Sequence, residues 1–181
     1  MEGTLQPIDL TTVVAPGDTV ASKSNSMAEA PIKITITIPT NAYFMSGLRD
    51  FTMNLVRNMT GFSEQWAYRF QSVIDELVNN AIEFGSAPGK DVKITFISQR
   101  GKSIDISVED TGTGPSKKSA EELAKLVEDR RHVNPLQITS IRGRGLAQIV
   151  ANWTDVLEFK NTPEGGLVVH VIKHLEAGEQ L

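Results

Sequence analysis

The sequence contains no cysteine, which excludes a disulfide framework, a thiol nucleophile and a cysteine-ligated metal site. No apolar run approaches the roughly 18 residues of a membrane-spanning helix, and the first 30 residues lack the basic start and apolar block of a signal peptide. The net charge of −4 argues against a nonspecific nucleic-acid binder, which normally has a basic face. We therefore expect a cytoplasmic protein that neither crosses a membrane nor contacts nucleic acid directly.

The composition fits one globular domain with a tail. Hydrophobic residues make up 40% and charged residues 22% of the 181 residues, as in ordinary soluble domains. Residues 1–30 have no sustained hydrophobic period, which predicts a disordered tail, with a regulatory or docking arm as the alternative. Residues 31–175 form the predicted domain, and residues 176–181 form a short C-terminal tail.

Hydrophobic periodicity predicts an alternation of strands and helices along the domain. Period-2 patterns predict a strand at 31–38 and two hairpins, 92–96 with 104–108 and 156–159 with 167–172. Apolar residues at steps of three and four predict helices at 44–59, 64–85 and 146–153. Asn41 or Thr40 can cap the first helix, Ser63 the second, and Ser119 with Glu122 forms a capping box for a short helix.

Glu76 and Asn80 lie four residues apart beside an apolar stripe of the second helix. The stripe contains Trp66, Phe70, Val73, Ile74, Leu77 and Ala81. The spacing brings the side-chain bases of Glu76 and Asn80 to roughly 5–6 Å, close enough to act on one bound group. A carboxylate at the edge of an apolar stripe suits a general base. The alternative is a pair of ordinary surface residues on an amphipathic helix.

Two glycine motifs follow this helix. The first, Asp110 to Gly114 (DTGTG), comes directly after a strand, where Gly112 and Gly114 allow a sharp turn and a close approach to a ligand; an ordinary turn is the alternative. The second is Arg142-Gly143-Arg144-Gly145-Leu146, which opens a helix and could bind phosphate through its backbone N–H groups, or could be a plain helix start. Residues 116–141 between them are long for a connection and fit a mobile lid over a ligand.

The order of these motifs resembles the GHKL ATP-binding superfamily of gyrase, heat-shock chaperone, histidine-kinase and mismatch-repair ATPases. No Walker sequence GxxxxGK[ST] occurs, so P-loop chemistry is excluded. The resemblance covers about residues 31–175. In size and layout the chain is most similar to bacterial anti-sigma-factor serine kinases of the RsbW and SpoIIAB type.

The resemblance implies a Bergerat-type fold, a two-layer α/β sandwich with a mixed, mostly antiparallel sheet and helices on one face. It also implies that Glu76 is the catalytic base and that Asn80 ligates Mg²⁺ and links the metal to the phosphates of ATP. Asp110 would receive the adenine amino group, while Gly112 and Gly114 would shape the nucleotide pocket.

The segment Gly143, Arg144, Gly145 and Leu146 corresponds by the same resemblance to the second glycine box, whose backbone N–H groups hold phosphates. Mg²⁺ prefers oxygen ligands shared with phosphates, and phosphoryl transfer mainly requires positioning and charge neutralisation. Arg142 and Arg144 could supply that charge, or they could be solvated arginines.

Three features depart from the family pattern. Glu83 and Phe84 stand where relatives commonly have Lys and His, and Leu167 stands where relatives have a Thr that helps to bind adenine through water. The histidines, which are His132, His170 and His174, are not on a dimerising helix pair upstream, as a sensor histidine kinase would require.

These considerations predict an ATP-dependent serine/threonine protein kinase that is also an anti-sigma factor. It would phosphorylate a Ser or Thr of an anti-anti-sigma (STAS) partner and sequester a sigma factor when that partner is phosphorylated; relatives imply a homodimer. The main alternative is a nucleotide-loaded binding adaptor that transfers no phosphate, and the third possibility is a globular domain that binds no nucleotide.

Overall fold

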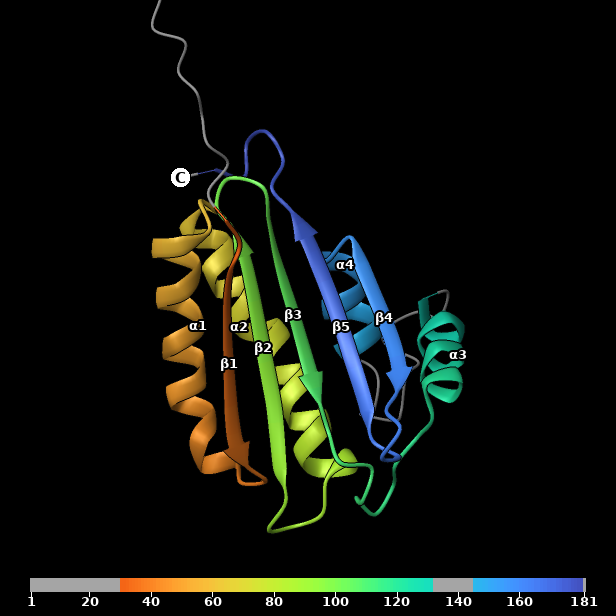
Figure 1. The fold of residues 1–181 in the computed structure, drawn as a ribbon. Coiled ribbons are helices and arrows are strands. Elements are labelled where there is room, and N and C mark those ends of the chain that lie inside the picture. The colour runs from red at the N-terminus through yellow and green to blue at the C-terminus, as the bar shows by residue number, and fades with distance from the viewer. Residues whose placement is uncertain (1–29, 132–144, 181) are drawn as a thin grey trace, which may run out of the picture.

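Strands with alternating apolar and polar residues form one sheet in the computed structural model, which describes residues 30–131 and 145–180. Within this part of the chain the sheet has five strands in the order β1-β2-β3-β5-β4 (Figure 1). Its strands are β1 (Ile32–Pro39), β2 (Asp91–Gln99), β3 (Ser103–Glu109), β4 (Val156–Asn161) and β5 (Leu167–His174). All of their pairings are antiparallel, which confirms the expected mostly antiparallel sheet. The parallel pairing that a mixed sheet would contain does not occur among the described strands.

The helices lie against one face of this sheet, so the predicted two-layer sandwich is confirmed. Figure 1 shows α2 and α4 behind the strands, α1 beside the edge strand β1 and α3 beside the edge strand β4. The helical elements are η1 (Ala42–Phe44), α1 (Met45–Met59), α2 (Glu64–Asn80), η2 (Ala81–Gly85), α3 (Ala120–Arg131), η4 (Leu146–Val150) and α4 (Ala151–Trp153). None of the described helices has the length and apolar character needed to cross a membrane.

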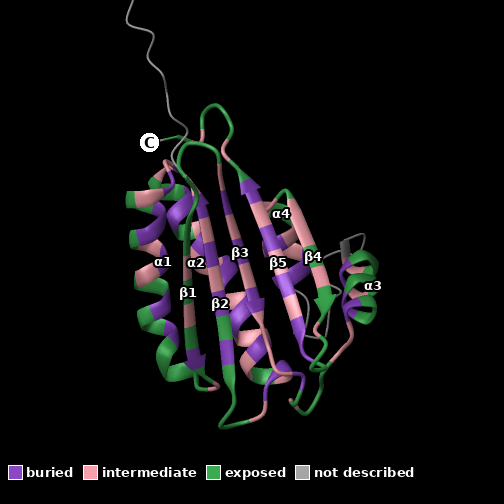
Figure 2. Ribbon diagram, viewed as in Figure 1, coloured by how far each residue is buried: buried purple, intermediate pink, exposed green. Residues whose placement is uncertain are grey.

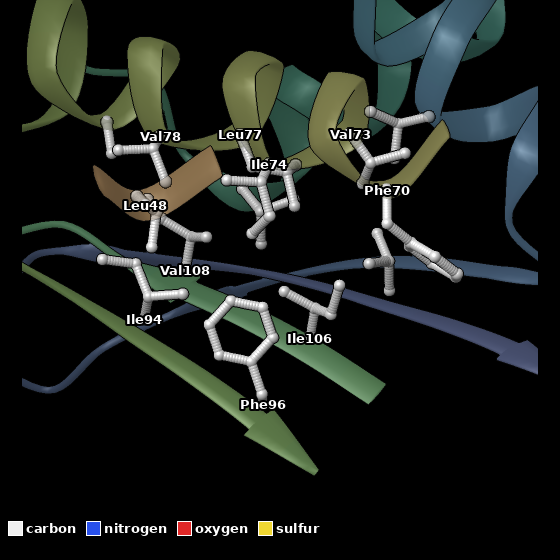
Figure 3. Packing of buried hydrophobic residues seen from close by; sticks show 14 of the residues in the cluster. Leu48, Phe70, Val73, Ile74, Leu77, Val78, Ile94, Phe96, Ile106 and Val108 are labelled. Carbon is white, nitrogen blue, oxygen red and sulfur yellow. The ribbon is translucent and has the colours of Figure 1, made fainter. Parts of the chain in front are cut away.

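The core forms where the apolar stripe of α2 meets the inward face of the central strands. Phe70 and Ile74 of α2 are at most 1% exposed, and Phe96 and Ile106 of the strands are fully buried. Figure 3 shows these side chains pointing toward one another between the helix and the sheet. Buried residues concentrate on the inner face of the sheet and on the inner stripes of the helices (Figure 2). The stripe predicted from the sequence is buried in full, including Trp66 and Ala81.

Most of the predicted helix boundaries are confirmed. Asn41 caps η1, its side-chain oxygen accepting a hydrogen bond from the Tyr43 N–H at 2.9 Å. Ser63 occupies the N-cap position of α2, although its hydroxyl makes no capping hydrogen bond. Ser119 and Glu122 form the predicted capping box ahead of α3, with bonds of 2.8 and 3.2 Å.

The end of the long helix has a geometry that the sequence did not indicate. After Asn80 the chain continues as a single π-helical turn, η2, closed by a hydrogen bond of 2.8 Å from the Ser86 N–H to the Ala81 carbonyl. Such turns are rare and occur frequently at functional sites. The predicted stop near Gly85 is confirmed. Residues 1–29 of the predicted tail and residues 132–141 of the predicted lid lie outside the described residues.

Candidate functional site

Glu76 and Asn80 form a hydrogen-bonded pair on the last turns of α2. The Asn80 amide nitrogen donates to Glu76 Oε1 and to the Glu76 backbone carbonyl, both at 2.6 Å. Both residues are half-buried, as expected at the edge of an apolar stripe. The side-chain oxygen of Asn80 accepts no hydrogen bond from the described part of the chain and could ligate a hard cation. The predicted proximity of these two residues is confirmed.

Gly145 lies directly against the Glu76 carboxylate, although 69 residues separate them in the chain. The backbone of Gly145 has ordinary helical angles, with φ −65°, so its conformation does not require glycine. A Cβ at this position would instead overlap the Glu76 carboxyl group. Glycine is therefore needed at this position, because only a residue without a side chain lets the start of η4 lie so close to the Glu76–Asn80 pair of α2.

Asp110 leaves the end of β3 with its carboxylate held by the backbone. Its Oδ1 accepts hydrogen bonds from the Gly112 N–H at 2.8 Å and from the Leu167 N–H at 3.1 Å. The Asp110 N–H in turn donates to the Leu167 carbonyl at 2.9 Å, which ties the end of β3 to the start of β5. This acceptor is thereby oriented before any ligand arrives, which lowers the entropic cost of binding.

The DTGTG turn wraps around Asp110 and joins it to the end of η2. Gly112 has a φ of +63°, the left-handed region that favours glycine, and a Cβ there would also overlap the Gly165 carbonyl. The Gly114 N–H donates to the Gly85 carbonyl at 3.1 Å. Hydroxyls reinforce the junction, since the Thr111 N–H donates to Ser86 Oγ at 3.0 Å. The functional interpretation of both glycines is consistent with this packing.

A largely apolar hollow opens between α2, η2, the sheet and η4, with Asp110 and Asn80 on its wall. Its apolar lining comprises Leu77, Val108, Leu123, Leu146, Leu167 and Val169. The cavity volume is about 30 Å³, room for a water molecule or two, so a larger ligand must part its walls. An apolar slot with one oriented carboxylate suits a flat heterocycle that carries an amino group.

The structure brings together most of the predicted site residues. Asn80, Asp110 and Leu146 line the hollow, Gly112 and Gly114 form the turn beside it, and Glu76 and Gly145 lie in contact at its edge. The remaining predicted residues, which are Arg142, Gly143 and Arg144, lie outside the described residues. His170 and His174 do not line the hollow, and His132 is also outside the described part.

Among the residues that the sequence interpretation did not assign to the site, Phe84, Lys117 and Lys118 line the hollow together with its apolar residues. Phe84 could have been found from its place one turn beyond Asn80. The lysine pair directly follows the DTGTG turn, so its position in the sequence was the available signal. Leu167, at the start of β5, contributes an apolar side chain to the wall.

Metal binding at this site would depend on the ligand as well as on the protein. No cluster of three or more His, Asp or Glu side chains able to hold a metal occurs in the described ranges. Asn80 offers one suitable oxygen, and Mg²⁺ typically binds through one or two protein ligands together with substrate phosphates and water. The donor set thus fits a Mg²⁺ ion that arrives with a nucleotide.

The fold and the hollow define an α/β nucleotide-binding domain in which an oriented Asp and an Asn face the same cavity. A family model described as the histidine kinase-like ATPase domain matches residues 38–173 of the chain. The chain therefore belongs to the histidine kinase-like ATPase family, whose domains bind ATP. No curated protein matches the chain.

Proposed function

We propose that the protein is an ATP-dependent serine/threonine protein kinase that also acts as an anti-sigma factor. Its substrate would be a Ser or Thr hydroxyl of an anti-anti-sigma partner of the STAS type. With that partner phosphorylated, the protein, as a homodimer, would bind and sequester a sigma factor in the cytoplasm. Family membership supports ATP binding, and the geometry around Glu76 supports the transfer step.

The observation that carries the transfer step is the position of Glu76 between Asn80 and Gly145. The carboxylate is fixed by a 2.6 Å hydrogen bond from Asn80 and packs against the backbone at the start of η4. A general base must be held at hydrogen-bond reach of the proton it removes, and this packing restricts where the carboxylate can point. Such a fixed acid beside the nucleotide hollow is what a protein kinase of this family needs.

In the proposed reaction the hydroxyl proton of the protein substrate moves to Glu76. The hydroxyl oxygen forms a bond to the γ-phosphorus of ATP, the bond from that phosphorus to the β,γ-bridging oxygen breaks, and ADP leaves. Asn80 would hold Mg²⁺, which neutralises phosphate charge when bound. Asp110 would accept the hydrogen bond of the adenine amino group and so favour adenine over guanine.

A binding adaptor without phosphate transfer is the rival function, and three departures from the family pattern favour it, namely Glu83, Phe84 and Leu167. Glu83 is exposed on η2, at a position where the resemblance implies a cation that would assist phosphate binding. Both functions require the same nucleotide hollow. They differ only in whether Glu76 performs chemistry.

The substitution Glu76→Gln separates these functions. The protein is used to capture partners from extract of its native cells, and transfer of labelled γ-phosphate from Mg·ATP to the captured proteins is measured. We expect a labelled Ser or Thr on a small partner, and at least roughly a hundredfold slower labelling with Glu76→Gln, because general bases contribute about 10²–10⁴. The partner should still be captured by the variant.

The matched control is Glu64→Gln, the same chemical change at the exposed start of α2, away from the hollow. It should retain transfer. Captured partners that remain unlabelled while the protein demonstrably binds ATP would contradict the kinase and support the adaptor. Equal labelling by the wild type and Glu76→Gln would remove Glu76 from the reaction.

A further inference from the structure

Lys117 and Lys118 bring positive charge to the wall of the nucleotide hollow. They lie in the four-residue loop between the DTGTG turn and the capping box of α3. Among the described residues they are the cationic side chains that line the hollow, and both also border a neighbouring hollow of about 290 Å³ that includes Ser119 and Asn161. Two adjacent ammonium groups therefore lie at a hollow whose lining is otherwise largely apolar.

Neither lysine is neutralised within the described part of the chain. By contrast, Lys93 is paired with Glu109 at 2.5 Å and Lys160 with Glu158 at 3.2 Å. Lys117 and Lys118 have no ion pair and no side-chain hydrogen bond among the described residues; Lys117 is exposed and Lys118 is half-buried. A partly desolvated ammonium group without a counter-charge, such as that of Lys118, favours an anionic ligand.

The loop that carries the lysines is fixed at both ends. On one side the Gly114 N–H bonds to the Gly85 carbonyl at 3.1 Å. On the other side the Ala120 N–H donates to the Asn161 side-chain oxygen at 2.9 Å, next to the Ser119 capping box. These anchors restrict the loop to the rim of the hollow, so the lysines are held there.

The part of the lining that comes from α2 and η2 carries no charge. It consists of Leu77, Asn80, Ala81, Phe84 and Gly85. A nucleoside triphosphate carries several negative charges that a site must balance. Lys117 and Lys118 bring positive charge to the same hollow.

We propose that Lys117 and Lys118 contact phosphate oxygens of the bound nucleotide and give the site its preference for nucleoside polyphosphates over the free nucleoside. The inference rests on the proposed function, because it requires that the hollow binds ATP. It adds to that function the two residues that would distinguish a charged nucleotide from the uncharged nucleoside.

The test compares the affinities for ATP and for adenosine of the full chain and of the double variant Lys117→Met/Lys118→Met. Methionine retains most of the apolar stem and removes the charge. We expect ATP to bind at least roughly tenfold more weakly, because its phosphates lose charge-assisted hydrogen bonds. Adenosine affinity should change by less than about twofold, and the ATP affinity of the variant should depend less on salt.

The control is Lys102→Met/Lys125→Met, which removes the same charge at two exposed lysines that line neither hollow. Its ATP affinity should equal that of the wild type. An unchanged ATP affinity in the double variant, or an equal loss for ATP and adenosine, would overturn the inference. Failure of the wild type to bind either ligand would instead overturn the proposed function and the inference with it.

Discussion

Gly145 illustrates how one residue can control the chemistry of another that is distant in sequence. The Glu76 carboxylate occupies the space that a side chain at position 145 would need. We predict that Gly145→Ala displaces Glu76 and slows phosphate transfer on the order of a hundredfold, because small misplacements of catalytic groups have effects of that size. Single-turnover transfer of labelled phosphate at saturating ATP measures this effect.

Gly47 provides the matched control for this substitution. It is exposed in the first turn of α1, and a Cβ there would meet nothing within 4 Å. Gly47→Ala should leave transfer unchanged and stabilise the fold by about 0.5–1 kcal/mol, because alanine costs less conformational entropy in a helix. Wild-type transfer by Gly145→Ala would contradict the role of the contact.

At the scale of elements, the C-terminal segment after β5 is packed against the start of α2. The Ser63 N–H donates to the Glu179 carbonyl at 2.8 Å, and Phe62 forms an isolated β-bridge with Gln180. Lys173, whose side chain is 7% exposed, contacts Asp155 at 3.2 Å and Glu179 at 3.4 Å. Its ammonium group also lies 5.1 Å from the centre of the Trp66 ring.

The charges of this cluster define a pH range for its contribution to stability. Burial alone would raise the pKa of Asp155, but hydrogen bonds from the His174 N–H and from Lys173 outweigh it and hold the pKa below its ordinary 3.8. Burial likewise opposes the charge of Lys173, yet its contacts with Asp155, Glu179 and Glu176 raise its pKa above the ordinary 10.5. Asp155 therefore stabilises the fold above pH 3.8 and loses this effect at lower pH, and Lys173 does so below pH 10.5 and loses it at higher pH.

We predict that Asp155→Asn lowers the free energy of unfolding by about 1 kcal/mol at pH 7, the value being modest because the side chain is partly exposed. Urea unfolding of the wild type and the variant at pH 7 and at pH 2.5 measures the difference. It should shrink at the lower pH, where Asp155 of the wild type becomes protonated. A loss of unfolding free energy that is equal at pH 7 and at pH 2.5 would contradict the stabilising role of the Asp155 carboxylate.

The regular elements could be predicted because their side-chain pattern is local. Ile32, Ile34, Ile36 and Ile38 alternate within one strand, and the stripe from Trp66 to Ala81 repeats within one helix, so neighbours in sequence suffice. The π-helical turn at 81–85 could not be predicted, because it has no local signature and accommodates the approach of Gly85 to Asp110. The packing of residues 175–180 on α2 was likewise missed, since its partners are more than a hundred residues away.

The sequence indicates candidate residues for the site but not the distances between them. Glu76, Asn80 and Asp110 stand out by spacing and by the turn that follows β3. The contact of Gly145 with Glu76 and the position of Lys117 and Lys118 depend on how η4 and the loop before α3 pack over the sheet. Such long-range packing leaves no period in the sequence.

For the molecule as a whole, the central feature is a nucleotide site between the helix layer and one end of the sheet. Its lining comes from α2 with η2, the end of β3, the loop before α3 with α3 itself, η4 and β5. Asp110 is the residue on which they converge, because its carboxylate is bonded to Gly112 and Leu167 and faces the hollow.

Equilibrium titration of Mg·ATP against the wild type, Asp110→Asn and Asp105→Asn tests this claim most directly. Asp105 is on the same strand but points to the other face of the sheet, where it contacts His170 at 2.8 Å. We predict that the wild type and Asp105→Asn bind ATP equally, and that Asp110→Asn binds at least roughly tenfold more weakly through loss of a charged acceptor. Equal ATP affinity for all three proteins would contradict the site.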